Sequence, residues 1–152
     1  MQEAWKNRDR YIEARVEHVT KKIDALIENP DKQDCIIRIG GDANVLEEIR
    51  TELISKGYSI PQGDWVMFPL PRFSKDTDEA SKKREAYKKS CIETLEKMIE
   101  DCISCKVECI KLRVQHIVSY DIVNHFKQKG YDVMSKEHQA VFRDIEINFP
   151  SF

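Results

Sequence analysis

The sequence predicts an α/β fold in which a helix–strand–helix–strand unit occurs twice within a single domain, residues 1–152. The first observation behind this prediction is that long segments with apolar residues at helical spacing alternate with short segments rich in β-branched residues. The second is the motif Lys-Gly-Tyr at 56–58 and again at 129–131, each time between a helical pattern and a β-branched residue. An internal duplication, with halves of about 1–73 and 74–152, would account for both observations.

The first half is predicted to begin with a long helix over about 3–29. Its apolar residues recur every three or four positions, at Ile12, Val16, Val19, Ile23 and Leu26. Pro30 ends this helix, because the residue before a proline is disfavoured in helical conformation. A strand at 35–39 follows, and then a helix that ends at Gly57, since glycine adopts the left-handed conformation of a helix end at little steric cost. A strand at 64–70 closes the half.

The second half repeats this order. It begins with a helix over about 78–102, whose apolar stripe consists of Ile92, Leu95, Met98 and Ile99. A strand at 109–114 follows. Ser119 is the predicted N-cap of the next helix, which ends at Gly130. The strand 141–149 completes the half.

Three of the four predicted strands alternate apolar with polar residues, as in a sheet that is covered on one face only. In 109–114, for example, Ile110, Leu112 and Val114 point away from Cys109, Lys111 and Arg113. We therefore predict an α+β two-layer sandwich, with four helices on one face of a mixed four-stranded sheet. The open face should carry Arg38, Lys111 and Arg113 as neighbours, with Asp144 and Glu146 opposite. Such a face either forms an ion network in solvent or binds a partner or an anionic ligand.

The strand at 64–70 is the exception, because it is apolar on both faces. Trp65, Met67 and Phe68 are candidates for a homodimer interface on its second face. Pro69 and Pro71 restrict this strand to a sheet edge or a strand end, since proline cannot donate a ladder hydrogen bond. The alternative is that the first long helix folds back over the same face.

Three of the five cysteines lie close together as Cys102-x-x-Cys105-x-x-x-Cys109. A structural zinc site needs a fourth ligand, which would have to come from His116, Cys35 or Cys91. Cys102 continues the apolar stripe of its helix and Cys109 lies in a predicted strand, which favours cysteines packed as small hydrophobic residues. Zinc, and a redox pair formed by Cys102 and Cys105, remain as alternatives.

The composition bounds the class of protein. Apolar residues make up 41% and charged residues 34% of the 152, which is typical of a folded globular protein. The net charge of −2 gives no overall attraction to nucleic acid or anionic lipid. The N-terminal segment lacks the apolar stretch of a signal peptide, and no run approaches the ~20 apolar residues of a membrane span. Five cysteines, an odd number, suit a reducing compartment with free thiols, so we expect a cytoplasmic protein.

Two loops at strand ends, 40–42 and 115–119, could form a ligand site. Gly40 and Gly41 precede a helix, whose exposed amides can bind phosphate. The loop matches neither established phosphate-binding glycine motif, and Asp42 at the N-cap position would repel an anion. If Asp42 and His116 met, they could perform acid–base chemistry. This hypothesis makes the chain a small-molecule or nucleotide-binding protein, or an enzyme.

The segment Ser-Lys-Lys-Arg-Glu-Ala-Tyr-Lys-Lys concentrates cations at 82–89. Cations at helical spacing are typical of a solvated helix face, and here they are offset by nearby carboxylates. Contact with phosphates is the alternative. Because no aromatic base-stacking pattern lies beside the segment, nucleic-acid binding is the third hypothesis.

The chain shows no complete metal-ligand set, nucleotide loop or nucleophile–base motif. This favours a non-enzymatic intracellular binding or assembly protein without a cofactor, whose partner is a second copy of the chain or another protein. The compact helix–strand–helix–strand unit with its Lys-Gly-Tyr helix end resembles small accessory proteins of large viruses and phages. That resemblance covers about half of the chain and transfers no residue and no activity.

Overall fold

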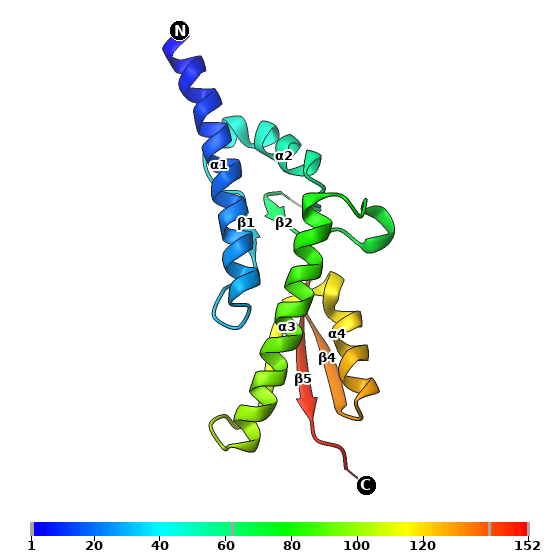
Figure 1. Cartoon of the computed structure of the whole chain (residues 1–152). Helices are drawn as coiled ribbons and strands as arrows, with labels where there is room; N and C mark the ends of the chain where they lie inside the picture. The colour runs from blue at the N-terminus through cyan, green and yellow to red at the C-terminus, as the bar shows by residue number, and fades with distance from the viewer. Residues whose placement is uncertain (1, 62, 140, 152) are drawn as a thin grey trace. The chain divides into compact units, whose positions relative to one another are not determined.

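The computed structural model describes residues 2–61, 63–139 and 141–151. Over these residues the chain has four α-helices, one antiparallel sheet of two strands and one antiparallel sheet of three (Figure 1). The predicted α/β class is therefore confirmed. The chain forms two compact units: unit 1 contains Met1–Ala25 and Ile36–Lys83, and unit 2 contains Leu26–Cys35 and Arg84–Phe152. That residues 1–152 act as a single domain stays a prediction.

Unit 1 contains most of the first helix, a second helix and the two-stranded sheet. Its elements are α1 (Gln2–Glu28, in unit 1 up to Ala25), β1 (Ile37–Arg38), the 3₁₀ turn η1 (Ala43–Val45), α2 (Leu46–Ser55), β2 (Trp65–Val66) and the 3₁₀ turn η2 (Pro71–Phe73). β1 pairs with β2, with Ile37 opposite Val66. An isolated antiparallel bridge joins Ser59 to Met67, the residue that follows β2.

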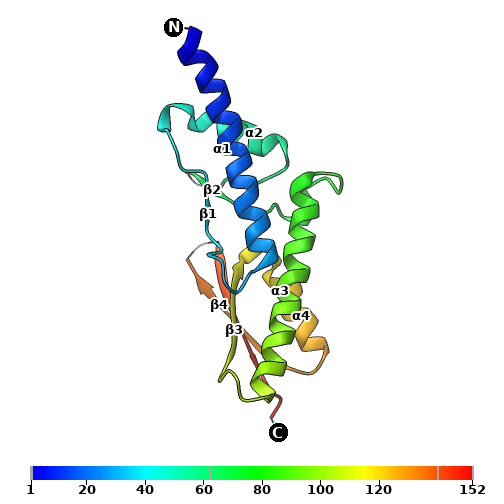
Figure 2. The same cartoon turned by 60° about the vertical axis from the view of Figure 1, so that its left-hand side comes forward.

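Unit 2 contains two helices and the three-stranded sheet. Its elements are α3 (Glu79–Ile103, in unit 2 from Arg84), β3 (Ile110–Gln115), α4 (His116–Gln128), β4 (Asp132–His138) and β5 (Phe142–Asn148). The strand order is β3-β5-β4, and β5 is antiparallel to both neighbours. Figure 2 shows α3 and α4 on the same side of this sheet.

The alternation predicted for the first strand of unit 2 is confirmed. Ile110, Leu112 and Val114 are buried, whereas Lys111 and Arg113 are exposed. Burial of every second residue is what helices covering one face of a sheet produce. The one-sided packing that was predicted for the whole chain is therefore present within unit 2.

The predicted helix ends are present in both units. Gly57 and Gly130 have φ values of +97° and +95°. The amide of Tyr58 donates to the carbonyl of Leu53, and the amide of Tyr131 donates to that of Phe126, each at 3.2 Å. These are the long hydrogen bonds of a Schellman motif.

The mixed four-stranded sheet is not confirmed, because the structure forms two separate antiparallel sheets. Arg38 lies in β1, so it does not share a sheet with Lys111 and Arg113. β4 was not predicted as a strand, since its sequence is largely polar and Val133 is its one buried hydrophobic residue. β2 forms a ladder over two residues only, although the sequence predicted a strand over 64–70.

The start of α4 also differs from the prediction. The helix begins at His116, after the extended residue Gln115, and Ser119 lies inside its first turn. The hydroxyl of Ser119 donates to the carbonyl of His116 at 2.6 Å instead of capping the helix. A serine or threonine inside a helix commonly satisfies its hydroxyl in this way.

Candidate functional site

The open face of the unit 2 sheet carries charges of both signs, in register across three strands. We call the side chains of Lys111, Arg113, Lys136, Asp144 and Glu146 the charged face. Arg113 and Lys136 lie opposite Asp144 on either side of β5, and Lys111 lies opposite Glu146. Residues opposite one another in adjacent strands point to the same face. Asp144 of the central strand therefore lies between a cation on each outer strand, whereas Glu146 lies between Lys111 and Met134.

Arg113 and Asp144 form the tightest ion pair of the charged face. The Nε of Arg113 is 2.9 Å from Oδ1 of Asp144, and its terminal Nη2 is 3.4 Å from Oδ2. This two-point hydrogen bonding, with the charge of Arg113, holds the pKa of Asp144 below its ordinary value and raises that of Arg113. Asp144 is therefore ionised at neutral pH.

A groove of about 370 Å³ lies beside the charged face, within unit 2. Its lining residues are Pro30, Asp31, Gln33, Asp34, Cys35, Met98, Lys111, Leu112 and Arg113. Two carboxylates of the segment after α1 thus face two cations of β3. The thiol of Cys35 offers no nucleophile at neutral pH, because burial and then the charge of Asp34 raise its pKa to about 11.

A buried polar network connects the groove segment to the end of β3. The amide of Gln115 donates to the hydroxyl of Tyr87 at 3.2 Å, and its side-chain Nε2 donates to the carbonyl of Cys35 at 3.5 Å. Gln115 and Tyr87 are fully buried. Gln115 begins the loop 115–119 that was a candidate ligand site, but its side chain is buried in this network. Tyr87 was not predicted as a site residue.

The glycine loop at 40–42 packs against α1. Gly40 and Gly41 both have positive φ, and a Cβ on Gly41 would clash with the hydroxyl of Tyr11. Asp42 donates its amide to that hydroxyl at 2.9 Å, and its side chain accepts from the amide of Asn44 at 2.9 Å. Asp42 is therefore the N-cap that was predicted, here of η1. These contacts explain both glycines by the conformation and packing of a tight turn, without a bound ligand.

Asp42 and His116 belong to different compact units. His116 is exposed at the first position of α4, where its amide donates to the carbonyl of Val141 at 2.8 Å. The acid–base pair of Asp42 and His116 stays a prediction.

The proposed dimer residues of 64–70 are mostly covered by the chain itself. Met67 and Phe68 are buried, and Trp65 is half-buried with the guanidinium of Arg38 4.9 Å from its ring centre. Arg38 also forms an ion pair with Asp64 at 3.0 Å. The dimer contact at Trp65, Met67 and Phe68 stays a prediction, and the burial of two of its three side chains does not support it.

All five cysteines are free. Cys35 and Cys91 are buried, Cys102 is half-buried, and Cys105 and Cys109 are exposed. Treating the clustered cysteines as core residues was therefore wrong for Cys105 and Cys109. Within residues 2–61, 63–139 and 141–151, no three His, Cys, Asp or Glu side chains are placed to share a metal ion.

Most cations of 82–89 are used within the chain. Lys83 pairs with Asp24 at 2.8 Å, Lys88 pairs with Glu85 at 2.8 Å, and Arg84 is buried. Lys82 and Lys89 are exposed. The segment thus presents a weaker basic surface than its sequence indicates.

Comparison with protein-family models, with curated proteins and with solved structures finds no match to this chain. In the part of the chain that the structure describes, no helix has the length and apolar character to cross a membrane.

Proposed function

We propose that the chain is a non-enzymatic, intracellular protein-binding or assembly module, and that the charged face with its adjoining groove is its recognition surface. The observation that carries the proposal is the in-register arrangement of cation, carboxylate and cation across β3, β5 and β4. Among the described residues, Lys111, Lys136 and Glu146 form no ion pair within the chain. These charges are therefore available to a partner.

The charged face contributes little to the stability of the fold, so stability alone is a weak explanation for it. Cross-strand pairs of opposite charge contribute about 0.2–1 kcal/mol each. Met134, opposite Glu146 and 46% exposed, adds an adaptable apolar contact to the same face. A charged face with an exposed methionine suits recognition of another protein better than it suits solvation alone.

A second copy of the chain is the partner that this pattern favours. In a twofold dimer the same surface meets itself. Two copies offset by one strand would place Lys136 of one copy against the carboxylates Asp144 and Glu146 of the other. The five free cysteines fit a reducing, cytoplasmic setting for this assembly.

Sedimentation velocity over a range of concentrations tests the proposal. The wild-type chain should self-associate, and Lys111→Glu/Lys136→Glu should shift it to monomer by placing like charges together. Lys82→Glu/Lys89→Glu makes the same change in net charge at exposed positions elsewhere and should leave association unchanged. A chain that stays monomeric at every concentration, and whose cross-linked partners are unaffected by the Lys111→Glu/Lys136→Glu change, would refute the proposal.

A further inference from the structure

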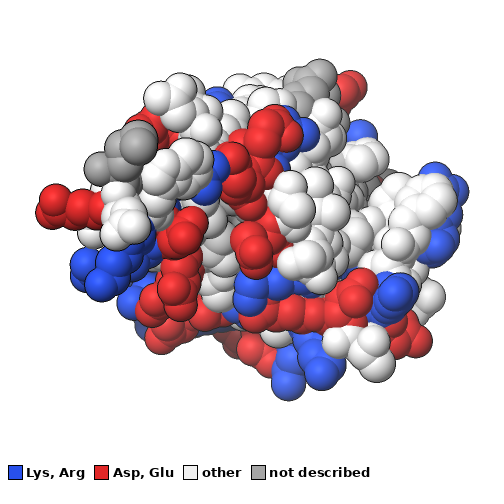
Figure 3. All heavy atoms as spheres, turned by 90° about the horizontal axis from the view of Figure 1, so that it is seen from above, with Lys and Arg blue, Asp and Glu red and all other residues white. Residues whose placement is uncertain are grey.

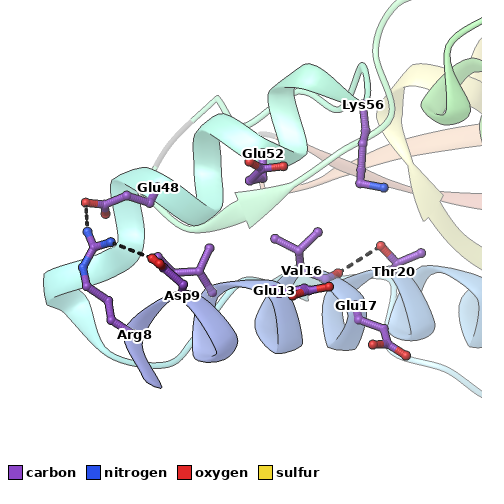
Figure 4. Close-up of a pocket in the computed structure, with 10 residues that line it drawn as sticks. Arg8, Asp9, Glu13, Val16, Glu17, Thr20, Glu48, Glu52 and Lys56 are labelled. Atoms are coloured by element: carbon purple, nitrogen blue, oxygen red, sulfur yellow. Dashed lines mark hydrogen bonds and ion pairs between the residues drawn. The ribbon is translucent and has the colours of Figure 1, made fainter. Parts of the chain in front are cut away.

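Unit 1 carries a groove between α1 and α2 with a volume of about 750 Å³ (Figure 4). Its lining residues are Arg8, Asp9, Ile12, Glu13, Val16, Glu17, Thr20, Glu48, Glu52 and Lys56. The part of the groove nearest to the helices is apolar, since Ile12 is half-buried and Val16 is 8% exposed. Figure 4 shows Val16 and Thr20 of α1 directed toward α2, and Glu52 and Lys56 of α2 directed toward α1, whereas Glu17 lies at the outer margin.

Carboxylates line both sides of the groove. Asp9, Glu13 and Glu17 follow one another at four-residue intervals on α1, and Glu48 and Glu52 do so on α2. Residues four apart lie on the same face of a helix. Like charges at this spacing destabilise a helix by about 0.2–0.5 kcal/mol per pair, so helix stability does not explain the arrangement.

The two cations of the lining, Arg8 and Lys56, lie at opposite ends of the groove, so only carboxylates carry charge in its middle. Arg8 binds Glu48 and lies 3.8 Å from Asp9 at one end. Lys56 lies at the other end, where it pairs with Glu79 at 3.7 Å. Across the described ranges of the chain, neither Glu13 nor Glu52 takes part in an ion pair. Figure 3 shows acidic side chains in clusters on the face seen from above, with basic side chains among them and toward the margins.

We propose that this groove binds a basic amphipathic helix of a partner protein. An apolar floor between two acidic walls is complementary to a helix with one apolar stripe flanked by Lys or Arg. Trp5, 62% exposed, lies one helical turn before Arg8, whose guanidinium is 5.2 Å from the Trp5 ring centre. Exposed tryptophan is a frequent energetic anchor of interfaces. Carboxylates on both walls would repel nucleic acid.

The chain's own basic segment is a poor occupant of the groove. Lys83 and Lys88 are held in ion pairs, and Arg84 is buried. The structure therefore favours a different protein over a second copy, and this inference is independent of self-association through the charged face in unit 2.

A synthetic amphipathic helix of Leu and Lys, labelled with a fluorophore, is the probe. Fluorescence anisotropy should show salt-dependent binding to the wild-type chain. Glu13→Lys/Glu52→Lys should weaken binding at least about tenfold, because it places like charges together in the groove. The matched control Glu108→Lys/Glu137→Lys makes the same change in net charge at exposed positions of unit 2 and should bind like wild type. Circular dichroism checks that each variant folds.

Two further arms separate groove binding from diffuse attraction. A peptide with the same lysines and Gln in place of Leu should bind more weakly, because it cannot fill the apolar floor. Lys111→Glu/Lys136→Glu should bind the Leu-Lys peptide like wild type, whatever its effect on self-association. No binding of the Leu-Lys peptide, equal weakening by the Glu108→Lys/Glu137→Lys control, or equal affinity for the Gln peptide overturns the proposal.

Discussion

Unit 1 and unit 2 contain the same succession of long helix, strand, capped helix and two further extended segments. In unit 1, β1 pairs with β2, and the residue after β2 bridges to Ser59. In unit 2, β3 pairs with β5, which also pairs with β4. The extent of pairing differs greatly. β1 and β2 have two residues each, whereas the strands of unit 2 have six or seven. Only unit 2 therefore has a face wide enough to present rows of charges.

The grooves of the two units show a parallel contrast. Each lies between the long helix and the capped helix and has the lysine of the Lys-Gly-Tyr motif in its lining. In unit 2 this groove between α3 and α4, which is distinct from the one beside the charged face, has a volume of about 440 Å³. There Glu96 pairs with His125 at 3.3 Å and with Lys129 at 3.4 Å. In unit 1 the corresponding space is larger, and Glu13 and Glu52 are available to a ligand. The surface that we propose for recognition thus lies on a sheet in unit 2 and between helices in unit 1.

We expect the largest difference between the units in the rate of cysteine labelling, when a core residue of each unit is substituted separately. All five cysteines belong to unit 2, so thiol labelling reports on that unit alone. Burial raises the pKa of Cys35 to about 11 and that of Cys91 to about 12, and both should react only after local opening. Phe126→Ala removes a fully buried ring of unit 2 and should speed their labelling on the order of 10²–10³-fold.

Leu53→Ala is the matched variant, because Leu53 occupies the corresponding cap position in unit 1 and is also fully buried. It should change the labelling of Cys35 and Cys91 much less. Both variants are made in a background that lacks the more accessible thiols, Cys102→Ser/Cys105→Ser/Cys109→Ser. Equal acceleration by the two variants would show that the units open together, as the predicted single domain requires.

The two helix-ending glycines should differ in their tolerance of a side chain. An alanine in the left-handed conformation costs roughly 1–2 kcal/mol at either position. At Gly57 its Cβ would also lie 2.8 Å from the Cβ of Asp78, whereas at Gly130 it would meet open space. Gly57→Ala should therefore lower the free energy of unfolding by about 1–3 kcal/mol more than Gly130→Ala, as for an overpacked site. Urea denaturation measures both, and equal losses would mean that Asp78 moves aside freely.

The helix ends could be predicted from sequence because they depend on local chemistry. Glycine in the left-handed conformation and a buried residue four positions earlier are properties of one short segment, as at Leu53 and Gly57. The alternation in β3 was equally local. It correctly placed Lys111 and Arg113 on an exposed face with Asp144 and Glu146 opposite.

The features that depend on strand partners could not be predicted. β4 is largely polar and is defined by pairing with β5, so its sequence alone resembles a loop and Lys136 was missed. Whether β1 pairs within the sheet of β3 likewise depends on tertiary contacts that the local sequence does not encode. Arg38 was therefore predicted on the wrong sheet. The same limit hid the groove residues Asp31 and Asp34, since nothing local indicates that their segment lies beside β3.

The ion pair of the charged face should give the smallest effect. Arg113 lowers the pKa of Asp144, so the pair stabilises the fold above the ordinary pKa of 3.8, and this contribution is lost as the pH falls through the lower folded value. Asp144→Asn should therefore cost about 0.2–1 kcal/mol at neutral pH, and the difference from wild type should fade in acid. Chemical denaturation at several pH values measures this dependence. In an Arg113→Gln background the cost of Asp144→Asn should disappear, because its partner is already absent. A cost that persists there would show that the Asp144 carboxylate stabilises unit 2 without its ion pair to Arg113.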